Sequence, residues 1–140
     1  MPTVDTNVLL RWMLDDVPEL TPRADLIITK PPKCVVPNEA LIEVVYVLER
    51  VIGASRPAVA QSLETLFAVA NVAADRELWT QCLTDYLGHP KLSIVDVFLA
   101  AQAVRARKIP LYTFDGKLAK QIEVAELPPR YQASGKDPGG

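Results

Sequence analysis

Hydrophobic and polar positions form two kinds of pattern along the chain: short apolar runs, and longer stretches in which apolar residues recur at helical spacing. The short runs contain many β-branched or aromatic residues and are bounded by Pro, Asp or Asn, which is typical of strands. We predict five strands on this basis, at Thr3–Val4, Cys34–Val36, Val72–Ala73, Pro110–Phe114 and Glu123–Leu127.

The stretches between these runs begin with capping residues or with proline in the first turn, as helices do. They predict helices at Asn7–Leu14, Thr21–Ile28, Asn38–Val51, Ser55–Val69, Asp75–Leu87 and Ser93–Arg107. Short strands that are each followed by a helix indicate an α/β fold, with a parallel sheet covered on both faces. In such a fold the functional site lies at the carboxyl ends of the strands, where Asp5 and Asp115 are found.

The composition favours a single domain without a membrane anchor. The chain has 140 residues, of which 49% are hydrophobic, and we assign residues 1–131 to one domain and 132–140, rich in Gly, Pro and polar residues, to a disordered tail. No segment reaches the ~18 consecutive apolar residues that a membrane span needs. Asp5 and Arg11 interrupt the N-terminal apolar run, so it does not resemble a signal peptide. We therefore expect a cytoplasmic protein.

Cysteine, histidine and charge restrict the chemistry further. Cys34 and Cys82 lie among apolar neighbours and are expected to be buried thiols, and His89 stands in a turn-like GHPK stretch. No spacing of Cys and His suggests a zinc site. The net charge of −2 argues against an extended basic face for nucleic acid, so such a partner has to be bound through a few cations or through a metal ion.

Four acidic residues stand in unusually apolar surroundings. Asp5 lies within TVDTNVLLRWML, Glu43 is the only charge in LIEVVYVL, Asp96 is the only charge in SIVDVFLAA, and Asp115 ends PLYTFD. A carboxylate among residues that favour burial costs several kcal/mol unless something pairs with it. Each of these acids therefore needs a structural or a chemical explanation.

Structural explanations exist for all four acids. Asp5 and Asp115 are placed to cap a turn or a helix at a strand end, and Asp96 completes a Ser93-x-x-Asp96 capping box. Asp96 also falls on the helix side of Leu99, Ala100 and Ala103, which predicts burial. Glu43 shares a side of its predicted helix with Glu39 and Arg50, as a solvated face would. These alternatives remain open at the level of the sequence.

The four acids together suggest a chemical role. Carboxylates gathered in one pocket repel each other unless a cation neutralises them, and an all-oxygen ligand set favours Mg²⁺ or Mn²⁺. Such an ion lowers the pKa of a bound water and supports attack on phosphorus. The pattern therefore favours metal-dependent hydrolysis of phosphodiester bonds, with the metal supplying the positive charge that the chain lacks.

Four segments of the chain resemble the signature blocks of PIN-domain proteins, in particular the VapC-type toxins of bacterial and archaeal toxin–antitoxin pairs. The segments are DTNVLLRWML, EVVYVL, SIVDVFLAAQA and LYTFDGKLAK, and the resemblance extends from about Val4 to Pro128. It implies a three-layer α/β/α sandwich with a short-stranded parallel sheet, and a Mg²⁺- or Mn²⁺-dependent ribonuclease acting on RNA. It also implies a homodimer and inhibition by a VapB-type antitoxin encoded beside it.

Carried over by position, the resemblance makes Asp5, Glu43, Asp96 and Asp115 the catalytic and metal-binding acids. Glu43 is preferred to Glu39 because EVVYVL follows it, and the valine after Asp96 departs from the small residue common there. Asn7 and Thr113 match the polar residues that accompany the first and last acids, and the resemblance implies that they orient carboxylates or a metal-bound water. Independently of the resemblance, Lys117 and Lys120 follow Asp115 and Arg11 lies about one turn beyond Asn7, so these three residues either contact RNA phosphates or are ordinary solvated cations. Two alternatives remain: an RNA-processing nuclease without an antitoxin, and a catalytically weak binding or assembly module.

Overall fold

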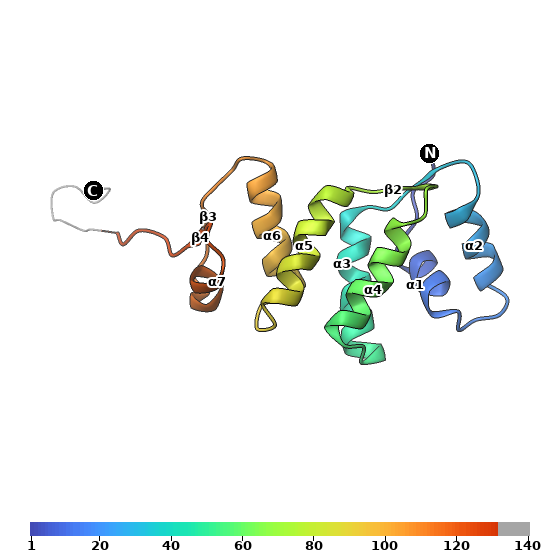
Figure 1. Cartoon of the computed structure of the whole chain (residues 1–140), viewed down its shortest axis with the longest axis horizontal. Coiled ribbons are helices and arrows are strands. Elements are labelled where there is room, and N and C mark those ends of the chain that lie inside the picture. Colours follow the sequence, from blue (N-terminus) through green and yellow to red (C-terminus); the bar gives the residue numbers. More distant parts are fainter. Residues whose placement is uncertain (132–140) are drawn as a thin grey trace. The chain divides into compact units, whose positions relative to one another are not determined.

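The computed structural model describes residues 1–131, so the tail predicted at 132–140 lies outside the described residues (Figure 1). The chain divides into two compact units, Met1–Pro90 and a second that begins at Lys91. The first contains α1 (Thr6–Leu14), α2 (Thr21–Thr29), β1 (Cys34–Val35), α3 (Asn38–Val47), η1 (Leu48–Ile52), α4 (Arg56–Phe67), β2 (Val72–Ala73) and α5 (Arg76–Gly88). The second contains α6 (Ile94–Arg105), β3 (Leu111–Tyr112), α7 (Gly116–Gln121) and β4 (Ala125–Glu126).

The strands of the first unit are short and parallel. β1 pairs with β2 in the register Cys34 to Val72. The predicted strand at Thr3–Val4 is reduced to a single parallel bridge from Thr3 to Val35, supported by a 3.0 Å hydrogen bond from the Val4 N–H to the Val35 carbonyl. Asp5 therefore follows a short extended segment that lies beside β1.

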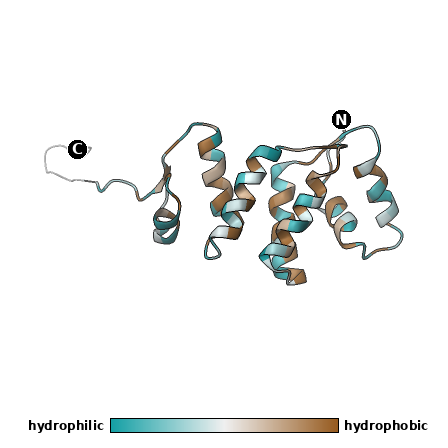
Figure 2. Cartoon of the chain, in the orientation of Figure 1, coloured by the Kyte–Doolittle hydropathy of each residue, from teal (hydrophilic) through white to brown (hydrophobic). Residues whose placement is uncertain are grey.

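Helices provide most of the core of the first unit. α1 packs against α2 and α3, and α4 packs against η1 and α5. Figure 2 shows hydrophobic and hydrophilic residues alternating around the helices, as expected when each buries one side. The largest fully buried side chains here include Trp79, Tyr86, Leu41 and Leu63. Cys34 and Cys82 are buried and free, as predicted, and burial raises the pKa of the Cys82 thiol to about 12.

The helix predicted at Asn38–Val51 has two parts in the structure. Its α-helical part, α3, ends at Val47 and continues as the π-helical segment η1, which ends at Ile52 and is followed by its C-cap Gly53 with φ 78°. β-branched residues such as Val47, Val51 and Ile52 hold the α form weakly because their χ1 rotamers are restricted. The wider turn of η1 ends with the Gly53 N–H donating to the Leu48 carbonyl.

Tyr86 links three elements of the first unit. Its ring is fully buried, its hydroxyl donates to the Glu49 carboxylate on η1, and the Arg56 guanidinium of α4 stacks 4.2 Å from the ring centroid. Arg56 also donates to the Tyr86 carbonyl at 2.8 Å. Burial, together with the bond to Glu49, raises the pKa of Tyr86 above its ordinary value.

Asn71 clamps the end of α2 from a distant part of the chain. Its side-chain amide donates to four backbone carbonyls, at 3.5 Å to Ile27, 3.1 Å to Ile28, 2.8 Å to Lys30 and 3.2 Å to Pro32. Two amide hydrogens are thus shared among four acceptors. The connection from α2 to β1 is held in place by a residue just before β2.

The second unit contains a β–α–β arrangement. β3 and β4 are parallel, with Leu111 opposite Ala125, and α7 connects them. α7 was not among the predicted helices, because six residues are too few to show a helical repeat. The other helices and all five extended segments occur near the predicted positions, with ends that differ by a few residues.

The prediction of an α/β fold with short parallel strands is confirmed. Within residues 1–131, no helix combines the length and the hydrophobicity needed to cross a membrane.

Candidate active site

Asp5 lies where the extended segment beside β1 turns into α1. It is exposed and caps the helix, with its Oδ1 accepting a 3.1 Å hydrogen bond from the Val8 N–H. The capping role considered from the sequence is therefore present. It occupies one carboxylate oxygen and leaves Oδ2 without a hydrogen bond to the described residues.

Glu43 lies on α3 and faces the same hollow as Asp5. The hollow has a volume of about 260 Å³, and Glu39 also lines it, one helical turn before Glu43. Both glutamates are exposed, so the solvated-face alternative for Glu43 is correct about its exposure. The fold nevertheless brings Glu43 to the hollow that Asp5 lines, although 38 positions separate the two residues in the sequence.

Asp96 forms the predicted capping box at the start of α6. The Asp96 N–H donates to Ser93 Oγ at 3.1 Å, and the Ser93 N–H donates to Asp96 Oδ2 at 3.1 Å. The carboxylate is half-buried. Burial on its side of the helix is uneven, because Ala100 is buried while Leu99 is 43% exposed. As at Asp5, one carboxylate oxygen remains unused by the cap.

Asp115 caps α7 at the end of β3. Its Oδ1 accepts from the Lys117 N–H at 2.9 Å and from the Leu118 N–H at 3.3 Å. Thr113 supports this turn, since its Oγ1 accepts a 3.0 Å hydrogen bond from the Asp115 N–H. Both cap bonds use the same oxygen, so Oδ2 of Asp115 is also left over.

The predicted phosphate contacts are distributed over two surfaces. In the second unit, exposed Lys117 and Lys120 line an open hollow of about 700 Å³ with Asp115; Asp96 does not line it. In the first unit, Arg11 lines a cavity of about 200 Å³ between α1 and α2, together with Asn7. Arg11 is already paired with Asp16, through Nε at 3.0 Å from Oδ1 and Nη2 at 3.2 Å from Oδ2.

The donor set of the Asp5–Glu43 hollow fits a hard divalent cation. Within each unit, the described residues hold no group of three or more His, Cys, Asp or Glu side chains arranged to bind a metal ion. Mg²⁺ does not require one, because it is commonly held by one or two carboxylates and completes its coordination with water and substrate phosphate. Asp5 and Glu43 provide two such carboxylates, and no nitrogen or sulfur ligand lines the hollow.

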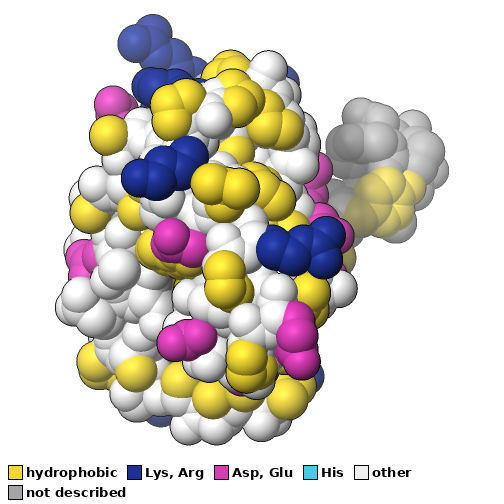
Figure 3. Space-filling model, turned by 90° about the vertical axis from the view of Figure 1, so that its right-hand side faces the viewer, with side chains coloured by type: hydrophobic (Ala, Val, Ile, Leu, Met, Phe, Trp, Pro, Cys, Tyr) yellow, Lys and Arg dark blue, Asp and Glu magenta, His cyan; other side chains and the backbone are white. Residues whose placement is uncertain are grey.

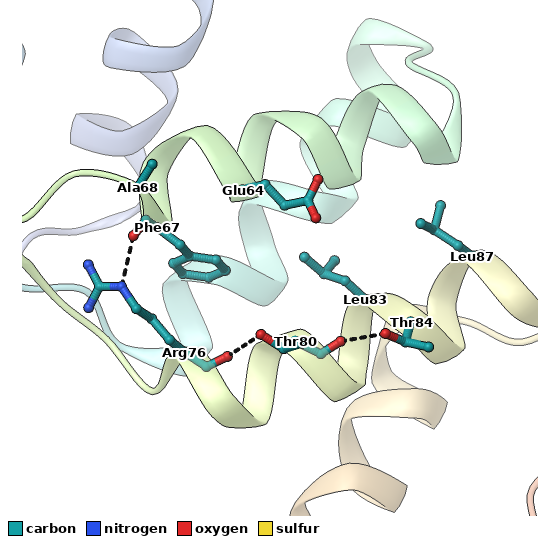
Figure 4. A pocket seen from close by; sticks show the side chains of 8 residues that line it. All are labelled: Glu64, Phe67, Ala68, Arg76, Thr80, Leu83, Thr84 and Leu87. Atoms are coloured by element: carbon teal, nitrogen blue, oxygen red, sulfur yellow. Dashed lines mark hydrogen bonds between the residues drawn. The ribbon is translucent and has the colours of Figure 1, made fainter.

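A separate cavity of about 310 Å³ lies between α4 and α5 and contains none of the predicted site residues (Figure 4). Phe67 and Leu83 point into it, and the Glu64 carboxylate lies at its edge. Arg76, which also lines it, turns its guanidinium toward backbone carbonyls, with a 2.8 Å bond from Nε to the Phe67 carbonyl. Its apolar walls and satisfied cation provide no catalytic group.

Two polar residues at these surfaces were not predicted. Glu39 was set aside in favour of Glu43, yet both line the same hollow. Arg23 lines the α1/α2 cavity with Asn7 and Arg11. Its signal in the sequence is the spacing of Leu20, Arg23 and Ile27, which places a cation between two apolar residues on one helix face.

Comparison with known proteins identifies the family of the chain. The sequence profile of the PIN domain matches residues 3–124, which include all four candidate acids, most of the first unit and the second unit up to the residue before β4. The comparison with curated proteins gave no match. Because the match spans most of the chain, this protein belongs to the PIN-domain family, whose fold is that of metal-dependent nucleases.

Proposed function

We propose that this chain is a Mg²⁺- or Mn²⁺-dependent ribonuclease that hydrolyses RNA phosphodiester bonds, and that it is the toxin of a type II toxin–antitoxin pair. The observation that carries the proposal is the hollow shared by Asp5 and Glu43, which offers only oxygen donors to a cation. Membership of the PIN-domain family supports the nuclease assignment.

We assign Asp5, Glu43, Asp96 and Asp115 to the cation. The helix caps are compatible with this role, because each capping aspartate uses one oxygen for the backbone and keeps the other. A bound divalent cation supplies Lewis-acid chemistry, polarising phosphoryl oxygens and making water a better nucleophile at neutral pH. Backbone caps restrict the rotation of the three aspartates and so orient the oxygens left over.

The polar residues near these acids are assigned to orientation and substrate binding. Asn7 follows Asp5 in the first turn of α1, and Thr113 fixes the backbone of Asp115. Lys117, Lys120 and Arg11 are assigned to RNA phosphates, which give no sequence information but fix the position of the strand. A few local cations are consistent with a chain whose net charge is −2.

The proposed partners are a second copy of the chain and a VapB-type antitoxin, in the cytoplasm. Exposed apolar residues support an interface, among them Val51, which is 74% exposed at the end of η1. The antitoxin is expected to place apolar residues on the toxin and a basic side chain against its acids.

The experiment is cleavage of labelled single-stranded and structured RNA by the purified chain. We expect cleavage with Mg²⁺ or Mn²⁺ and none with EDTA. Asp5→Asn, Asp96→Asn and Asp115→Asn should each reduce cleavage about a hundredfold or more, as disruption of a metal site does. Because Asn retains much of a capping hydrogen bond, these variants should stay folded in EDTA, with stability changed by roughly 1 kcal/mol or less.

Asp75→Asn is the matched control, because Asp75 caps α5 through a 3.2 Å bond from the Leu78 N–H and is not a candidate ligand. It should cleave RNA normally. Mn²⁺ should stabilise the folded wild type by about 1.4 kcal/mol at tenfold excess over Kd and so raise its melting temperature. The rise should be smaller in the three variants. Full activity in EDTA would contradict the metal mechanism. An Asp96→Asn protein that cleaves RNA normally but has a much lower melting temperature would show that Asp96 only caps α6 and does not bind the cation.

Two other outcomes separate the alternative functions. A protein that binds RNA but cleaves none under any metal condition is a binding or assembly module. If the chain cleaves RNA but no short reading frame for a DNA-binding antitoxin lies directly upstream of its gene, the chain is an RNA-processing nuclease.

A further inference from the structure

The cavity between α1 and α2 has a charge opposite to that of the neighbouring acidic hollow. Its lining includes two arginines, Arg11 and Arg23, and no acid, although acids outnumber bases in the chain. The Asp5–Glu43 hollow is lined by three acids and no cation. Consecutive residues at the start of α1 line the two surfaces, Thr6 the acidic hollow and Asn7 the cavity.

The walls of the cavity are apolar. On α2, Leu20, Arg23 and Ile27 lie three to four positions apart and so share one face of the helix. Ile27 is 41% exposed and lies beside buried Ala24, and Val8 contributes from α1. Figure 3 views the side of the molecule on which α2 lies and shows exposed apolar side chains among both basic and acidic ones. A flat apolar group could therefore pack on this apolar surface and also contact the two arginines.

The size of the cavity limits what it binds. Its volume of about 200 Å³ is below the ~300–1,000 Å³ typical of sites for drug-sized ligands, so it suits a single ring system. Unpaired bases of single-stranded RNA are commonly bound by stacking on aromatic rings or on guanidinium planes, with hydrogen bonds to their edges. Arginines at the cavity provide the planes, and the Asn7 amide provides a donor and an acceptor.

Both arginines are candidates for RNA phosphates, and Arg23 is the one whose charge no acid among the described residues balances. The charge of Arg11 is balanced by Asp16, through both Nε and Nη2. Arg23 is exposed and has no ion pair or hydrogen bond from its side chain to the described residues. The walls around it are fixed, since Trp12 Nε1 donates to Asp25 at 3.1 Å and Thr21 Oγ1 donates to the Val17 carbonyl at 3.2 Å.

We infer that this cavity is a nucleotide subsite: it receives one unpaired base of a single-stranded RNA next to the scissile bond, while Arg23 binds an adjacent phosphate. The inference rests on the proposed ribonuclease function and adds a specificity-determining position to it. The acidic hollow binds the scissile phosphate through a cation, and the cavity holds the neighbouring nucleotide by direct contact. This division explains how an acidic chain is able to position RNA.

The test is the affinity for a fluorescein-labelled single-stranded RNA oligonucleotide, measured by fluorescence anisotropy in EDTA so that no cleavage occurs. Arg23→Gln should weaken binding about tenfold, as expected for loss of one charge-assisted phosphate contact. Ile27→Asp should also weaken binding and should abolish the preference for the intact strand over one with abasic sites. Lys30→Gln, which changes a cation at the end of the same helix but outside the cavity, should bind as the wild type does.

The cleavage assay provides a second measurement. Arg23→Gln should raise KM about tenfold and leave kcat nearly unchanged, because Arg23 binds substrate away from the cation. Unchanged RNA affinity in Arg23→Gln, or equal affinity of the wild type for intact and abasic strands, would overturn the inference. The cavity would then be interpreted as a groove that binds a protein.

The two proposals fail in different ways. Cleavage of RNA by a chain in which Arg23→Gln has normal KM and affinity refutes the subsite and keeps the ribonuclease. Binding of RNA through Arg23 by a chain that never cleaves it refutes the ribonuclease and keeps the nucleotide cavity.

Discussion

At the scale of single residues, three candidate acids serve the fold and the site with different atoms. Asp5, Asp96 and Asp115 each offer one oxygen to a helix N-terminus and keep one free of hydrogen bonds to the described residues. A helix N-terminus favours negative charge, so the carboxylate is held without a neighbouring cation. This explains how such acids are tolerated in apolar segments before any metal binds.

Tyr86 provides a prediction about alkaline pH. Burial first, and then the bond to Glu49, raise its pKa above the ordinary value of 10.0, so folding stabilises the protonated phenol. This contribution to stability is complete below about pH 10 and is lost as the pH rises further. Tyr86→Phe should lower the free energy of unfolding at neutral pH by about 1 kcal/mol, through the lost bond to Glu49, and should flatten the alkaline decline.

Urea unfolding between about pH 8 and about pH 11 measures this effect. Tyr112→Phe is the control, because the Tyr112 ring is exposed in the second unit, and it should follow the wild type. An alkaline decline that is equally steep in Tyr86→Phe and in the wild type would show that Tyr86 does not cause it.

The four candidate acids stand out in the sequence because a charge inside an apolar run is conspicuous, and the caps formed by Asp5, Asp96 and Asp115 follow from their positions before helices. Arg23 and Asn71 could not be found in the same way. The spacing of Arg23 with Leu20 and Ile27 marks one helix face, but it points to a binding role only once the cavity beside it is seen. The four carbonyls that Asn71 binds lie some 40 positions away, beyond the range of local spacing rules.

At the scale of elements, the turn after η1 depends on glycine. Gly53 has φ 78°, and a Cβ there would meet no atom within 4 Å. Any loss of stability on adding a side chain therefore comes from the positive φ of the backbone and not from a steric clash with a neighbour. Gly53→Ala should lower the free energy of unfolding by about 1 kcal/mol. Gly88→Ala is matched to it, because that Cβ would also meet open space but the residue ends α5 without a positive φ.

Urea denaturation of the two variants separates strain from packing. Gly88→Ala should be neutral or slightly stabilising, since alanine favours helices. A Gly53→Ala protein as stable as the wild type would mean that the turn relaxes to another conformation.

Element positions were predictable because strand and helix periodicities differ and because Pro, Ser and Asp mark the starts of several helices. The change from α-helix to π-helix after Val47 could not be predicted, because residue spacing does not distinguish the two helix types over five residues. The six residues of α7 are likewise too short for a periodic signal. Length, more than composition, limited these predictions.

At the scale of the whole molecule, we expect a homodimer with twice the 15.4 kDa mass of the chain in light scattering at micromolar concentration. Val51 and Ile52, both more than half exposed at the end of η1, are the proposed contact. Val51→Lys should therefore shift the mass toward the monomer, because burying a lysine in an apolar interface is unfavourable.

Leu26→Lys is the comparison, since Leu26 is also a highly exposed apolar residue but belongs to α2. This variant should have the same mass as the wild type in light scattering. A wild-type protein that is monomeric at this concentration would contradict the dimer. If only Leu26→Lys converts the dimer to a monomer, the interface lies on α2 and not at the end of η1.

The clamp formed by Asn71 also affects the order in which the molecule is completed during synthesis. A growing chain that has not yet reached residue 71 contains all of α1 and α2 but lacks the amide that holds the end of α2. The ribosome thus makes the α1/α2 cavity's walls early, and the residue that secures one of them arrives only about 40 residues later.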